Sequence, residues 1–503
     1  MQSKILWITI FALAIVFYSL TMAKVYTYDA LSYAYSAQVG THDIERLLNP
    51  HHLGYHMFSY LYYYIWTWLG WNAGSLLPLQ IFNVIVSALS LAMFYRFVAD
   101  FTYRSIAYLM TLLLGVTNGY WLYSVEVEVY IPSILLLLLT FFFLNRWPIR
   151  QTYIGLALGF LWGAAILAHQ MNVLFLPVIL TAVLNQPMSS CLKIRTMQSI
   201  SLSALATISI PYFLAIVALQ LKSWNSVFYW LTWLAQTGIW GKLESSSLLN
   251  ATQGAFSAII AKSSSSSLDR LIPQLIALVL SFILICWRAY RNSPTIALQC
   301  MIWIVIYAIF FTWWEPDNLE FWINLLPPSF LLLVLSLRNL PQRWNKAVQG
   351  CLFASIFLLG INNWNVSIAP LQDPRTNPGL QKVMKIVHCV PAGSTVILNS
   401  SRFWAWLVYY RDLNVVVLDR IFLEVERGST NQTAETGLTE VRETIDQAFV
   451  QNRNVFWLIN TPDSTKIMKR NGINVDQLQR FFSRYSQKPV PCAFPLYQLN
   501  LIK

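Results

Sequence analysis

Long blocks of apolar residues without a single charge dominate this sequence. Residues 5–22, 76–95, 131–144 and 271–287 are four such blocks. A helix needs about 20 predominantly apolar residues to cross the hydrocarbon core of a bilayer, and most of the blocks reach or approach that length. Only 11% of the 503 residues are charged, whereas about a quarter are charged in an average soluble chain. The sequence therefore predicts a mainly α-helical, polytopic membrane protein.

Positively charged residues near the ends of the blocks predict the orientation of the chain. Cytoplasmic loops of membrane proteins carry an excess of Lys and Arg, and here the basic residues share one side when Lys4 is cytoplasmic and about 11 spans alternate. These residues are Arg96, Arg104, Arg146, Arg150, Lys193, Arg195, Arg288, Arg291, Arg338, Arg343 and Lys346. Because they are scattered singly, the net charge of +12 does not indicate a nucleic-acid surface. We expect a cytoplasmic N-terminus.

We expect two parts in the chain, a transmembrane module at residues 1–364 and a soluble extracytoplasmic domain at residues 375–503. The expected spans are residues 5–22, 76–95, 105–120, 129–144, 152–168, 173–184, 198–219, 271–287, 295–311, 321–337 and 347–361. The expected outer loops are residues 24–75, 118–129, 220–270 and 312–320. Within the first of these loops, two helices at residues 28–39 and 53–69 should lie on the outer surface of the membrane, because their aromatic residues favour the interface.

The C-terminal part alternates between two hydrophobic patterns, which predicts a small α/β domain with a largely parallel sheet. The expected strands are residues 395–398, 415–418, 455–459 and 496–502, and the expected helices are residues 379–387, 438–450 and 475–483. No glycine-rich phosphate loop is present, so we expect no nucleotide site. Cys389 and Cys492 both lie in this external part, where a disulfide is chemically permitted, although their spacing leaves the pairing open.

The first outer loop contains an acidic residue, Asp29, close to the end of the first span. A carboxylate at the outer surface is suited to act as a general base on a hydroxyl that approaches from the water. The alternative interpretation is a purely structural one, because Asp is also among the best N-caps of a helix. The same loop carries Asp43, Glu45 and Arg46.

The second outer loop carries two glutamates, Glu126 and Glu128, between valines at the start of a span. Ionisable groups are costly at a membrane boundary and are candidates for function. In an extended segment both side chains point to one face, where they can share a cation or position a substrate. The alternative is that one glutamate is solvated and the other pairs with a loop cation such as Arg46.

The fourth outer loop is both acidic and aromatic. It contains Trp314, Glu315, Asp317 and Glu320. Aromatic faces and carboxylates together suit a sugar ring, which stacks on the former and donates hydroxyl hydrogen bonds to the latter. An interfacial anchor also uses Trp, but it does not require the carboxylates.

Three histidines, His51, His52 and His56, follow Asn49 and Pro50 in the first loop. Although His52 and His56 have the spacing of one helix face, no H-E-x-x-H pattern accompanies them. A hydrogen-bonding role, structural or toward a substrate, therefore fits better than a zinc site.

The order of these features resembles the GT-C glycosyltransferases, and within them the protein O-mannosyltransferase and aminoarabinose-transferase-like group. The resemblance rests on Tyr28-Asp29-Ala30, on Asn49-Pro50-His51-His52-Leu53-Gly54-Tyr55, and on Glu126-Val127-Glu128-Val129-Tyr130. It has specificity over residues 5–150, and beyond them it rests on hydropathy and the external domain. Where many relatives have proline-rich sequence, this chain has His51-His52-Leu53.

The resemblance implies an inverting transfer of a sugar from a polyprenyl-phosphate donor to an acceptor hydroxyl on the outer face of a bacterial plasma membrane. Asp29 would activate the acceptor, and Glu126 and Glu128 would hold a divalent cation, Mg²⁺ or Mn²⁺. Candidate phosphate-binding residues are Lys24, Lys242 and Arg270. Candidate substrate-binding residues are Asp43, Glu45, Arg46, His52, Tyr55, Glu126, Glu128, Tyr130, Trp314, Glu315, Asp317 and Glu320.

Two other functions fit a chain with many spans. A transporter would carry polar groups and broken helices near the bilayer midplane, often in repeated halves, whereas these spans are nearly free of charge and show no repeat. A polymerase or ligase of surface polysaccharide would use the same type of carrier lipid but transfer a whole glycan. The sequence does not reveal the sugar or the acceptor, which is a protein, a lipid or a glycan.

Overall fold

The structure is a computed structural model that describes residues 2–147, 151–236, 240–262, 271–411, 413–422, 434–459, 473, 475–492 and 495–501. The chain divides into two compact units. The first consists of Met1–Ala23 and Ser36–Gln372, and the second of Lys24–Tyr35 and Asp373–Lys503. Each unit is described separately below.

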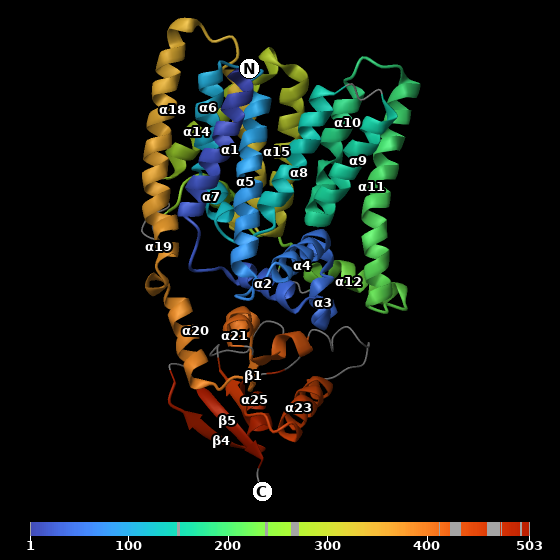
Figure 1. The fold of residues 1–503 in the computed structure, drawn as a ribbon, viewed down its shortest axis with the longest axis vertical. Coiled ribbons are helices and arrows are strands. Elements are labelled where there is room, and N and C mark those ends of the chain that lie inside the picture. Colours follow the sequence, from blue (N-terminus) through green and yellow to red (C-terminus); the bar gives the residue numbers. More distant parts are fainter. Residues whose placement is uncertain are drawn as a thin grey trace. The chain divides into compact units, whose positions relative to one another are not determined.

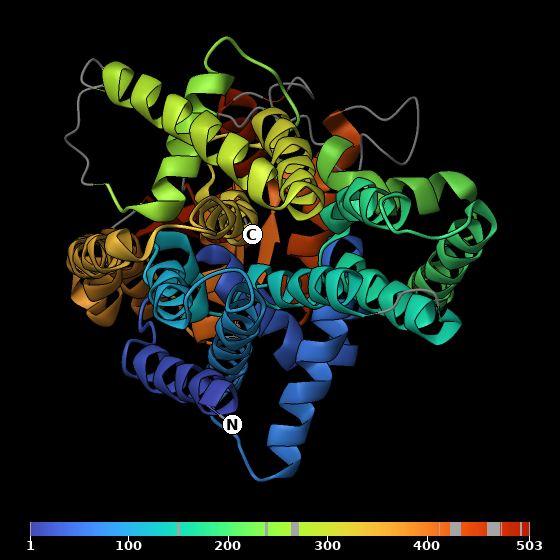
Figure 2. The same ribbon diagram turned by 90° about the horizontal axis from the view of Figure 1, so that it is seen from above.

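The first unit is helical, and its long helices run side by side (Figures 1 and 2). The longer helices are α1 (Gln2–Leu20), α5 (Leu76–Val98), α6 (Arg104–Gly115), α8 (Tyr130–Arg146), α9 (Thr152–Ala168), α10 (Leu176–Leu184), α11 (Ser190–Ala218), α14 (Leu271–Asn292), α15 (Pro294–Trp314), α17 (Leu326–Ser336) and α18 (Gln342–Asn363). Shorter helices connect them: η1 (Gly40–Asp43), α3 (Ile44–Leu47), η2 (Pro50–His52), α4 (Leu53–Trp68), α7 (Asn118–Ser124), η3 (Gln170–Phe175), α12 (Trp224–Gln236), α13 (Ser247–Ile259), α16 (Leu319–Trp322), η5 (Ile323–Leu325), η6 (Trp364–Ile368) and α19 (Ala369–Gln372).

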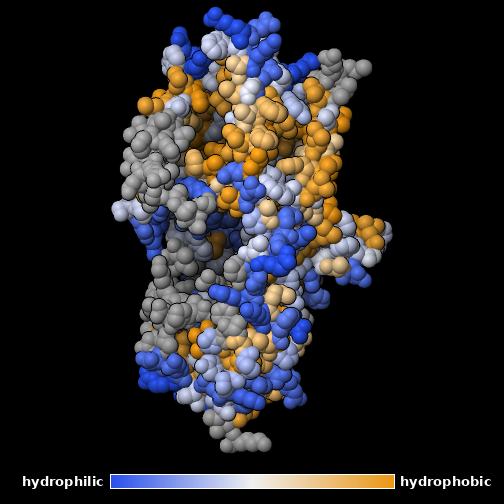
Figure 3. Space-filling model, turned by 90° about the vertical axis from the view of Figure 1, so that its left-hand side faces the viewer, coloured by the Kyte–Doolittle hydropathy of each residue, from blue (hydrophilic) through white to orange (hydrophobic). Residues whose placement is uncertain are grey.

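Among the described residues, five helices are long and apolar enough to cross a membrane. They are Leu76–Val98, Ser190–Ala218, Pro294–Trp314, Leu319–Ser336 and Gln342–Gln372, and five shorter apolar helices accompany them. Large apolar side chains such as Leu202, Phe213 and Phe357 are exposed on these helices. The hydrophobic surface over the long helices (Figure 3) is the surface that a bilayer would cover.

One expected span is interrupted. We expected a single helix over residues 105–120, but α6 ends at Gly115 and the separate helix α7 begins at Asn118. The amide of Asn363 donates a hydrogen bond to the carbonyl of Val116 at 2.8 Å. In a continuous helix this carbonyl would accept a backbone N–H of the next turn. The hydrogen bond from Asn363 replaces that partner, so the break between α6 and α7 leaves no unsatisfied carbonyl at Val116.

Helices α9 and α11 approach each other unusually closely because glycines line their contact. Gly155, Gly159 and Gly163 recur every fourth residue and so share one face of α9. A Cβ atom added at Gly159 would lie 2.2 Å from the carbonyl oxygen of Ile200 in α11. The hydroxyl of Ser203 in α11 also donates a hydrogen bond to the carbonyl of Leu156 at 2.7 Å. This small-residue contact is a common way to join helices in membranes, where apolar side chains gain little by leaving lipid.

The second unit contains the first part of α2 (Tyr28–Val39) and a five-stranded sheet in the order β2-β1-β3-β5-β4. The strands are β1 (Thr395–Leu398), β2 (Asn414–Val417), β3 (Val455–Leu458), β4 (Tyr485–Val490) and β5 (Leu496–Leu501), and the other helical elements are η7 (Pro374–Thr376), α20 (Pro378–Cys389), η8 (Ser401–Phe403), α21 (Trp404–Arg411), α23 (Ala434–Val450) and α25 (Val475–Phe482). Strand β1 pairs in parallel with β2 and β3, whereas β5 pairs antiparallel with β3 and β4. The prediction of a largely parallel sheet is therefore correct for β1, β2 and β3 and wrong for β4 and β5. The β4–β5 hairpin makes the sheet mixed, since a short connection can only join antiparallel strands.

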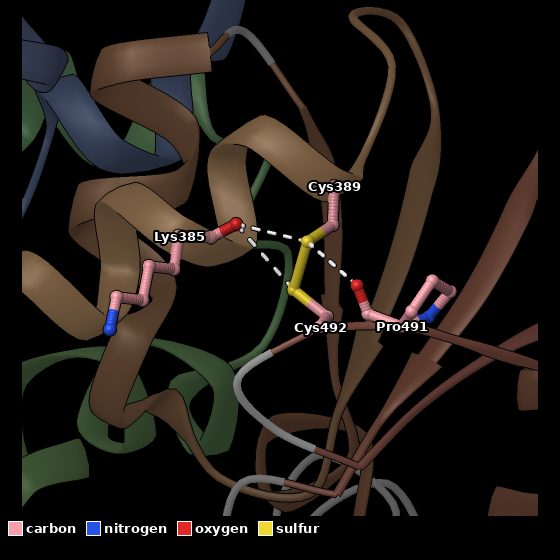
Figure 4. The surroundings of a disulfide bond; sticks show 4 residues. All are labelled: Lys385, Cys389, Pro491 and Cys492. Atoms are coloured by element: carbon pink, nitrogen blue, oxygen red, sulfur yellow. Dashed lines mark hydrogen bonds between the residues drawn. A yellow bond between two sulfur atoms is a disulfide. The ribbon is translucent and has the colours of Figure 1, made fainter.

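A disulfide between Cys389 and Cys492 joins the end of α20 to the segment after β4, with a Cα–Cα distance of 6.2 Å. Both sulfur atoms lie near the carbonyl oxygen of Lys385, at 3.1 and 3.5 Å (Figure 4). The structure thus pairs the two cysteines that the sequence left open. Of the remaining cysteines, Cys191 and Cys351 are exposed and Cys300 is buried.

Replacing Cys389 and Cys492 together by serine should lower the free energy of unfolding of the second unit by about 2–4 kcal/mol, because the bond restricts the unfolded chain. The two cysteines are 103 residues apart, so the bond closes a long loop. Thermal unfolding of the full-length protein in detergent measures the effect. Cys351→Ser, at an exposed free cysteine, is the matched control and should leave the transition in place. An unchanged transition in the double variant would contradict the prediction.

Candidate functional site

The loop that carries Glu126 and Glu128 is fixed by two amide side chains of helix α5. The amide nitrogen of Asn83 donates to the carbonyls of Glu126 at 2.9 Å and Glu128 at 2.8 Å. One turn earlier, the amide of Gln80 donates to the carbonyls of Ala23 and Val125, at 2.9 and 3.0 Å. A non-helical segment among membrane helices can persist only if its backbone groups are hydrogen-bonded. The two amides bind the carbonyls of Val125, Glu126 and Glu128.

Both glutamates of this loop are buried, with 0% of Glu126 and 1% of Glu128 exposed. A buried carboxylate is costly unless other groups compensate its charge. The backbone N–H of Val129 donates to a carboxylate oxygen of Glu128 at 3.2 Å. Burial raises the pKa of Tyr55 in α4, and the charge of Glu128 raises it further. Glu128 is therefore held in place where several elements meet.

Glu128 forms a carboxylate pair with Glu320, which lies in the fourth outer loop. Oxygen atoms of the two side chains lie within 4.8 Å of each other. The hydroxyl of Tyr130 donates to Glu320 at 3.0 Å, and the amide of Asn318 donates to the same oxygen at 2.7 Å. The structure thus brings together three predicted site residues, Glu128, Tyr130 and Glu320, from loops about 190 positions apart in the chain.

Asn318 extends this arrangement to a third carboxylate. Its amide also donates to Glu315 at 3.2 Å, and its carbonyl oxygen accepts from the backbone N–H of Glu320 at 3.2 Å, which caps α16. Burial raises the pKa of Glu315, while the hydrogen bond from Asn318 opposes this shift. Asn318 is thus the organising residue of the loop, and we had not singled it out from the sequence.

Stacked aromatic rings lie beside this loop. The ring of Trp314 is nearly parallel to those of Trp240 and Phe310, with centroids 6.3 and 5.9 Å apart and an interplanar angle of 12° in each case. A side chain at Gly241 would meet the ring of Trp313, which lies 3.0 Å from an added Cβ. The positive φ of 75° at this residue also favours glycine. The rings therefore form a rigid wall that is suited to stacking.

Asp29 lies in the first turn of α2, in the second unit. The alternative interpretation of this residue as an N-cap is wrong, because Thr27 precedes the helix and accepts the N–H of Ala30 at 3.2 Å. Tyr28 and Tyr35 pack against Trp404 of α21, with ring centroids 6.2 and 5.7 Å apart. The C-terminal domain thereby fixes the turn that carries Asp29.

Several other predicted site residues lie at the surface. Asp43 forms an ion pair with Arg46 and accepts its backbone N–H, so that it caps α3. Among the remainder, Lys24, Glu45, Lys242 and Asp317 are exposed, and Arg270 lies outside the described residues. His52 and Tyr55 lie at the start of α4.

Gln80 and Asn83 are site residues that our sequence interpretation missed, although a signal was present. Amides inside an apolar span are rare and usually meet a specific partner. Asn83→Leu keeps the volume but removes the donor of the buried carbonyls, which should cost about 1–3 kcal/mol of stability and release the loop of Glu128. We expect activity to fall at least tenfold in a turnover assay at a temperature where the variant is folded.

Asn145→Leu is the matched control for Asn83→Leu. Asn145 also donates from a span, to Gln299 at 2.8 Å and to the carbonyl of Phe141 at 2.9 Å. We expect this variant to lose comparable stability while the folded fraction keeps its activity. Equal loss of activity in the two variants would contradict a positioning role for Asn83.

Comparison with known proteins gives a match in fold and none in sequence. No protein-family model matches the chain, and no curated protein matches it significantly. The chain is similar to the aminoarabinose transferase ArnT from Cupriavidus metallidurans in two crystal structures, with TM-scores of 0.63 for the apo state and 0.60 for the state bound to undecaprenyl phosphate. The identity is 11% in both cases, and the alignments cover 98% of this chain and 97% of that one.

The similarity shows that the chain shares the fold of this transferase, in agreement with the fold that the resemblance implied. It extends over the helical unit and the C-terminal domain, whereas the sequence motifs had specificity only over residues 5–150. Together with the apolar helices, the fold identifies an integral membrane protein.

Proposed function

We propose that this chain is an inverting glycosyltransferase that moves a sugar from a polyprenyl-phosphate donor to an acceptor hydroxyl on the extracytoplasmic face of a bacterial plasma membrane. The observation that carries the proposal is the carboxylate pair of the buried Glu128 and the partly buried Glu320, in which Tyr130 and Asn318 bind Glu320. A fold alone does not determine function. A pair of neighbouring carboxylates, in a chain with the fold of a transferase that binds undecaprenyl phosphate, supports this reaction.

The proposed chemistry assigns one role to each group. The carboxylate of Asp29 accepts the proton of the acceptor hydroxyl as its oxygen attacks the anomeric carbon, and the bond from that carbon to the phosphate oxygen breaks. The leaving group is a phosphate, which departs without the acid catalyst that a glycosidase needs. The reaction therefore requires a base, positive charge for the phosphate and a place for the lipid.

A divalent cation is one source of that positive charge. Carboxylate oxygens are the ligands that Mg²⁺ and Mn²⁺ prefer, and Glu128 and Glu320 present oxygens within 4.8 Å of each other. The pair fits such an ion, which would neutralise charge on the phosphate. Glu128 is one of the two glutamates that the sequence suggested for this role. Lys24, Lys242 and Arg270 remain proposed contacts of the phosphate.

The orientation rests on the positions of Lys and Arg, which place the N-terminus in the cytoplasm and the C-terminal domain outside. The disulfide of Cys389 and Cys492 agrees with that placement, because disulfides persist in oxidising compartments.

Lipid-linked sugars extracted from cells with and without the gene distinguish the candidate functions. For the proposed transferase, loss of the gene should remove one glycan and accumulate one polyprenyl-phosphate monosaccharide. A polymerase or ligase would instead accumulate a polyprenyl-linked oligosaccharide. An unchanged pool of lipid-linked sugars would contradict the proposal and favour a transporter.

A further inference from the structure

A groove of about 700 Å³ lies between α10 and α11. It is close to the end of the helical unit at which α11 and the chain itself begin (Figure 1). Its walls come from the last turn of α10 and the first half of α11, and the lining residues of α11 are Lys193, Ile194, Met197, Gln198, Ser201 and Leu202. These positions have the spacing of one helix face. At a rise of 1.5 Å per residue, they form a stripe about 14 Å long.

The walls of the groove are apolar and face away from the helical bundle. Only 17% of the apolar, membrane-length window of α11 is buried. Ile194 and Leu202 expose 59% and 66% of their surface, and Leu184 on the α10 side exposes 62%. In a bilayer, side chains of this kind are covered by lipid. A groove with such walls suits an acyl chain.

The charge of the groove is at its mouth. Lys193 lies in the first turn of α11, and Gln198 and Ser201 follow about 8 and 12 Å further along the helix. The ammonium of Lys193 donates a hydrogen bond to the carbonyl of Leu184 at 2.6 Å. That carbonyl belongs to the last residue of α10 and has no partner within the helix. The bond holds Lys193 at the mouth and uses one of the three N–H donors of the ammonium.

No carboxylate among the described residues pairs with Lys193. The sequence contains no Asp or Glu between Glu128 and Glu244. Helices α4, α8, α9 and α15, which pack against α10 or α11, contain none either. A cation therefore stands beside an apolar groove in a part of the fold that supplies no anion.

We propose that this groove binds an anionic phospholipid, with an acyl chain between α10 and α11 and the phosphodiester beside Lys193. Basic pockets between transmembrane helices on the cytoplasmic side are suited to acidic lipid head groups. This end of α11 is the one that we expect in the cytoplasm, because Lys and Arg mark that side. The inference goes beyond the proposed transfer reaction and does not depend on it.

The position of the groove argues against the carrier lipid of the proposed reaction as its occupant. Lys193 and Ala218 lie near opposite ends of α11, about 38 Å apart along the helix axis. The expected outer loop at residues 220–270 follows Ala218. Glu128 and Glu320 also belong to loops that we expect on the outer side. A phospholipid of the opposite, inner leaflet is the occupant that fits Lys193.

Native mass spectrometry of the full-length, delipidated protein in detergent tests the proposal. Phosphatidylglycerol and phosphatidylcholine with the same acyl chains would be titrated separately, so that the head groups alone differ. We expect the first phosphatidylglycerol to bind at least about fivefold more tightly than the first phosphatidylcholine, which is the usual effect of one cation near an anionic head group. Phosphatidylglycerol should also raise the melting temperature, because a ligand of the folded state stabilises that state.

Two variants remove the charge and the space of the groove independently. Lys193→Gln should reduce the preference for phosphatidylglycerol to within about twofold. Lys222→Gln, at an exposed lysine beyond the other end of α11, should keep the full preference. Ser201→Phe fills the groove and should weaken the binding of both phospholipids at least about fivefold. Ile210→Phe, at an exposed residue of α11 that does not line the groove, is its control and should bind as wild type does.

Equal affinity of the wild type for the two phospholipids would overturn the proposal, as would an unchanged preference in Lys193→Gln or unchanged binding in Ser201→Phe. Tighter binding of undecaprenyl phosphate than of phosphatidylglycerol, lost in Ser201→Phe, would make the carrier lipid the occupant and would also overturn it. So would a dimer that binds neither phospholipid, because a second copy would then cover the groove. A thermal melt shows whether each variant is folded, and Ser201→Phe against Ile210→Phe decides the matter if Lys193→Gln is not.

Discussion

Replacing Asp29 by asparagine should reduce sugar transfer by at least about 10²–10⁴-fold, which is the usual contribution of a general base. The amide keeps the size of the side chain but accepts no proton from the acceptor hydroxyl. The fold should be unaffected, because Thr27 and not Asp29 caps α2. The aromatic contacts of Tyr28 and Tyr35 with Trp404 also remain. Turnover of a lipid-linked sugar by purified variants in liposomes measures the effect.

Glu244→Gln is the control for Asp29→Asn. Glu244 is an exposed acidic residue of the expected outer loop at residues 220–270 and is not a candidate site residue. This variant should keep its turnover within a few-fold of wild type. Normal turnover in Asp29→Asn would show that another group is the base, and the assignment of Asp29 would have to be abandoned.

Replacing Glu128 by glutamine should lower turnover by about 10²-fold or more, because one member of a charge-stabilising pair is lost. The same substitution should not lower the stability of the protein. A buried carboxylate 1% exposed is costly to maintain, so its neutral isostere should melt at the same or a higher temperature. Stability that is sacrificed for activity is typical of functional sites.

A double-variant cycle tests whether Glu128 and Glu320 act together. Their oxygens lie within 4.8 Å of each other, and neighbours at this distance are usually coupled. The variant Glu128→Gln/Glu320→Gln should therefore lose less activity than the product of the two single losses. Glu440→Gln, at an exposed glutamate of α23, serves as the control. Strictly multiplicative losses, or full activity in Glu128→Gln, would count against a shared role.

The membrane-spanning part of the fold could be predicted because its signal is local. Uncharged runs of about 20 residues have few alternatives to a helix in a bilayer, and the structure has helices at these runs. The strand at residues 395–398 was equally clear, because it is short, apolar and β-branched, and it coincides with β1. The two cysteines outside the spans likewise stood apart, although only the three-dimensional structure could pair them.

The parts that the sequence did not predict depend on tertiary contacts. Strand β4 reads Tyr485 to Val490 with four polar or proline residues, and a proline is tolerated there because β4 is an edge strand. The loop of Glu126 and Glu128 depends on Asn83, more than 40 residues earlier. No pattern within either segment reveals such a contact. The carboxylate candidates could be listed from the sequence, but the pairing of Glu128 with Glu320 could not.

Release of polyprenyl phosphate by the purified protein is the most direct test of the proposed reaction. The full-length chain in liposomes would be given lipid-linked sugars and acceptors extracted from its host membrane, and mass spectrometry would follow the carrier lipid. The proposed function predicts that wild type converts one polyprenyl-phosphate sugar to polyprenyl phosphate, in step with glycosylation of one acceptor, and that Asp29→Asn does not. If wild type consumes no lipid-linked sugar, or the two proteins release the carrier equally, the chain is not the transferase proposed.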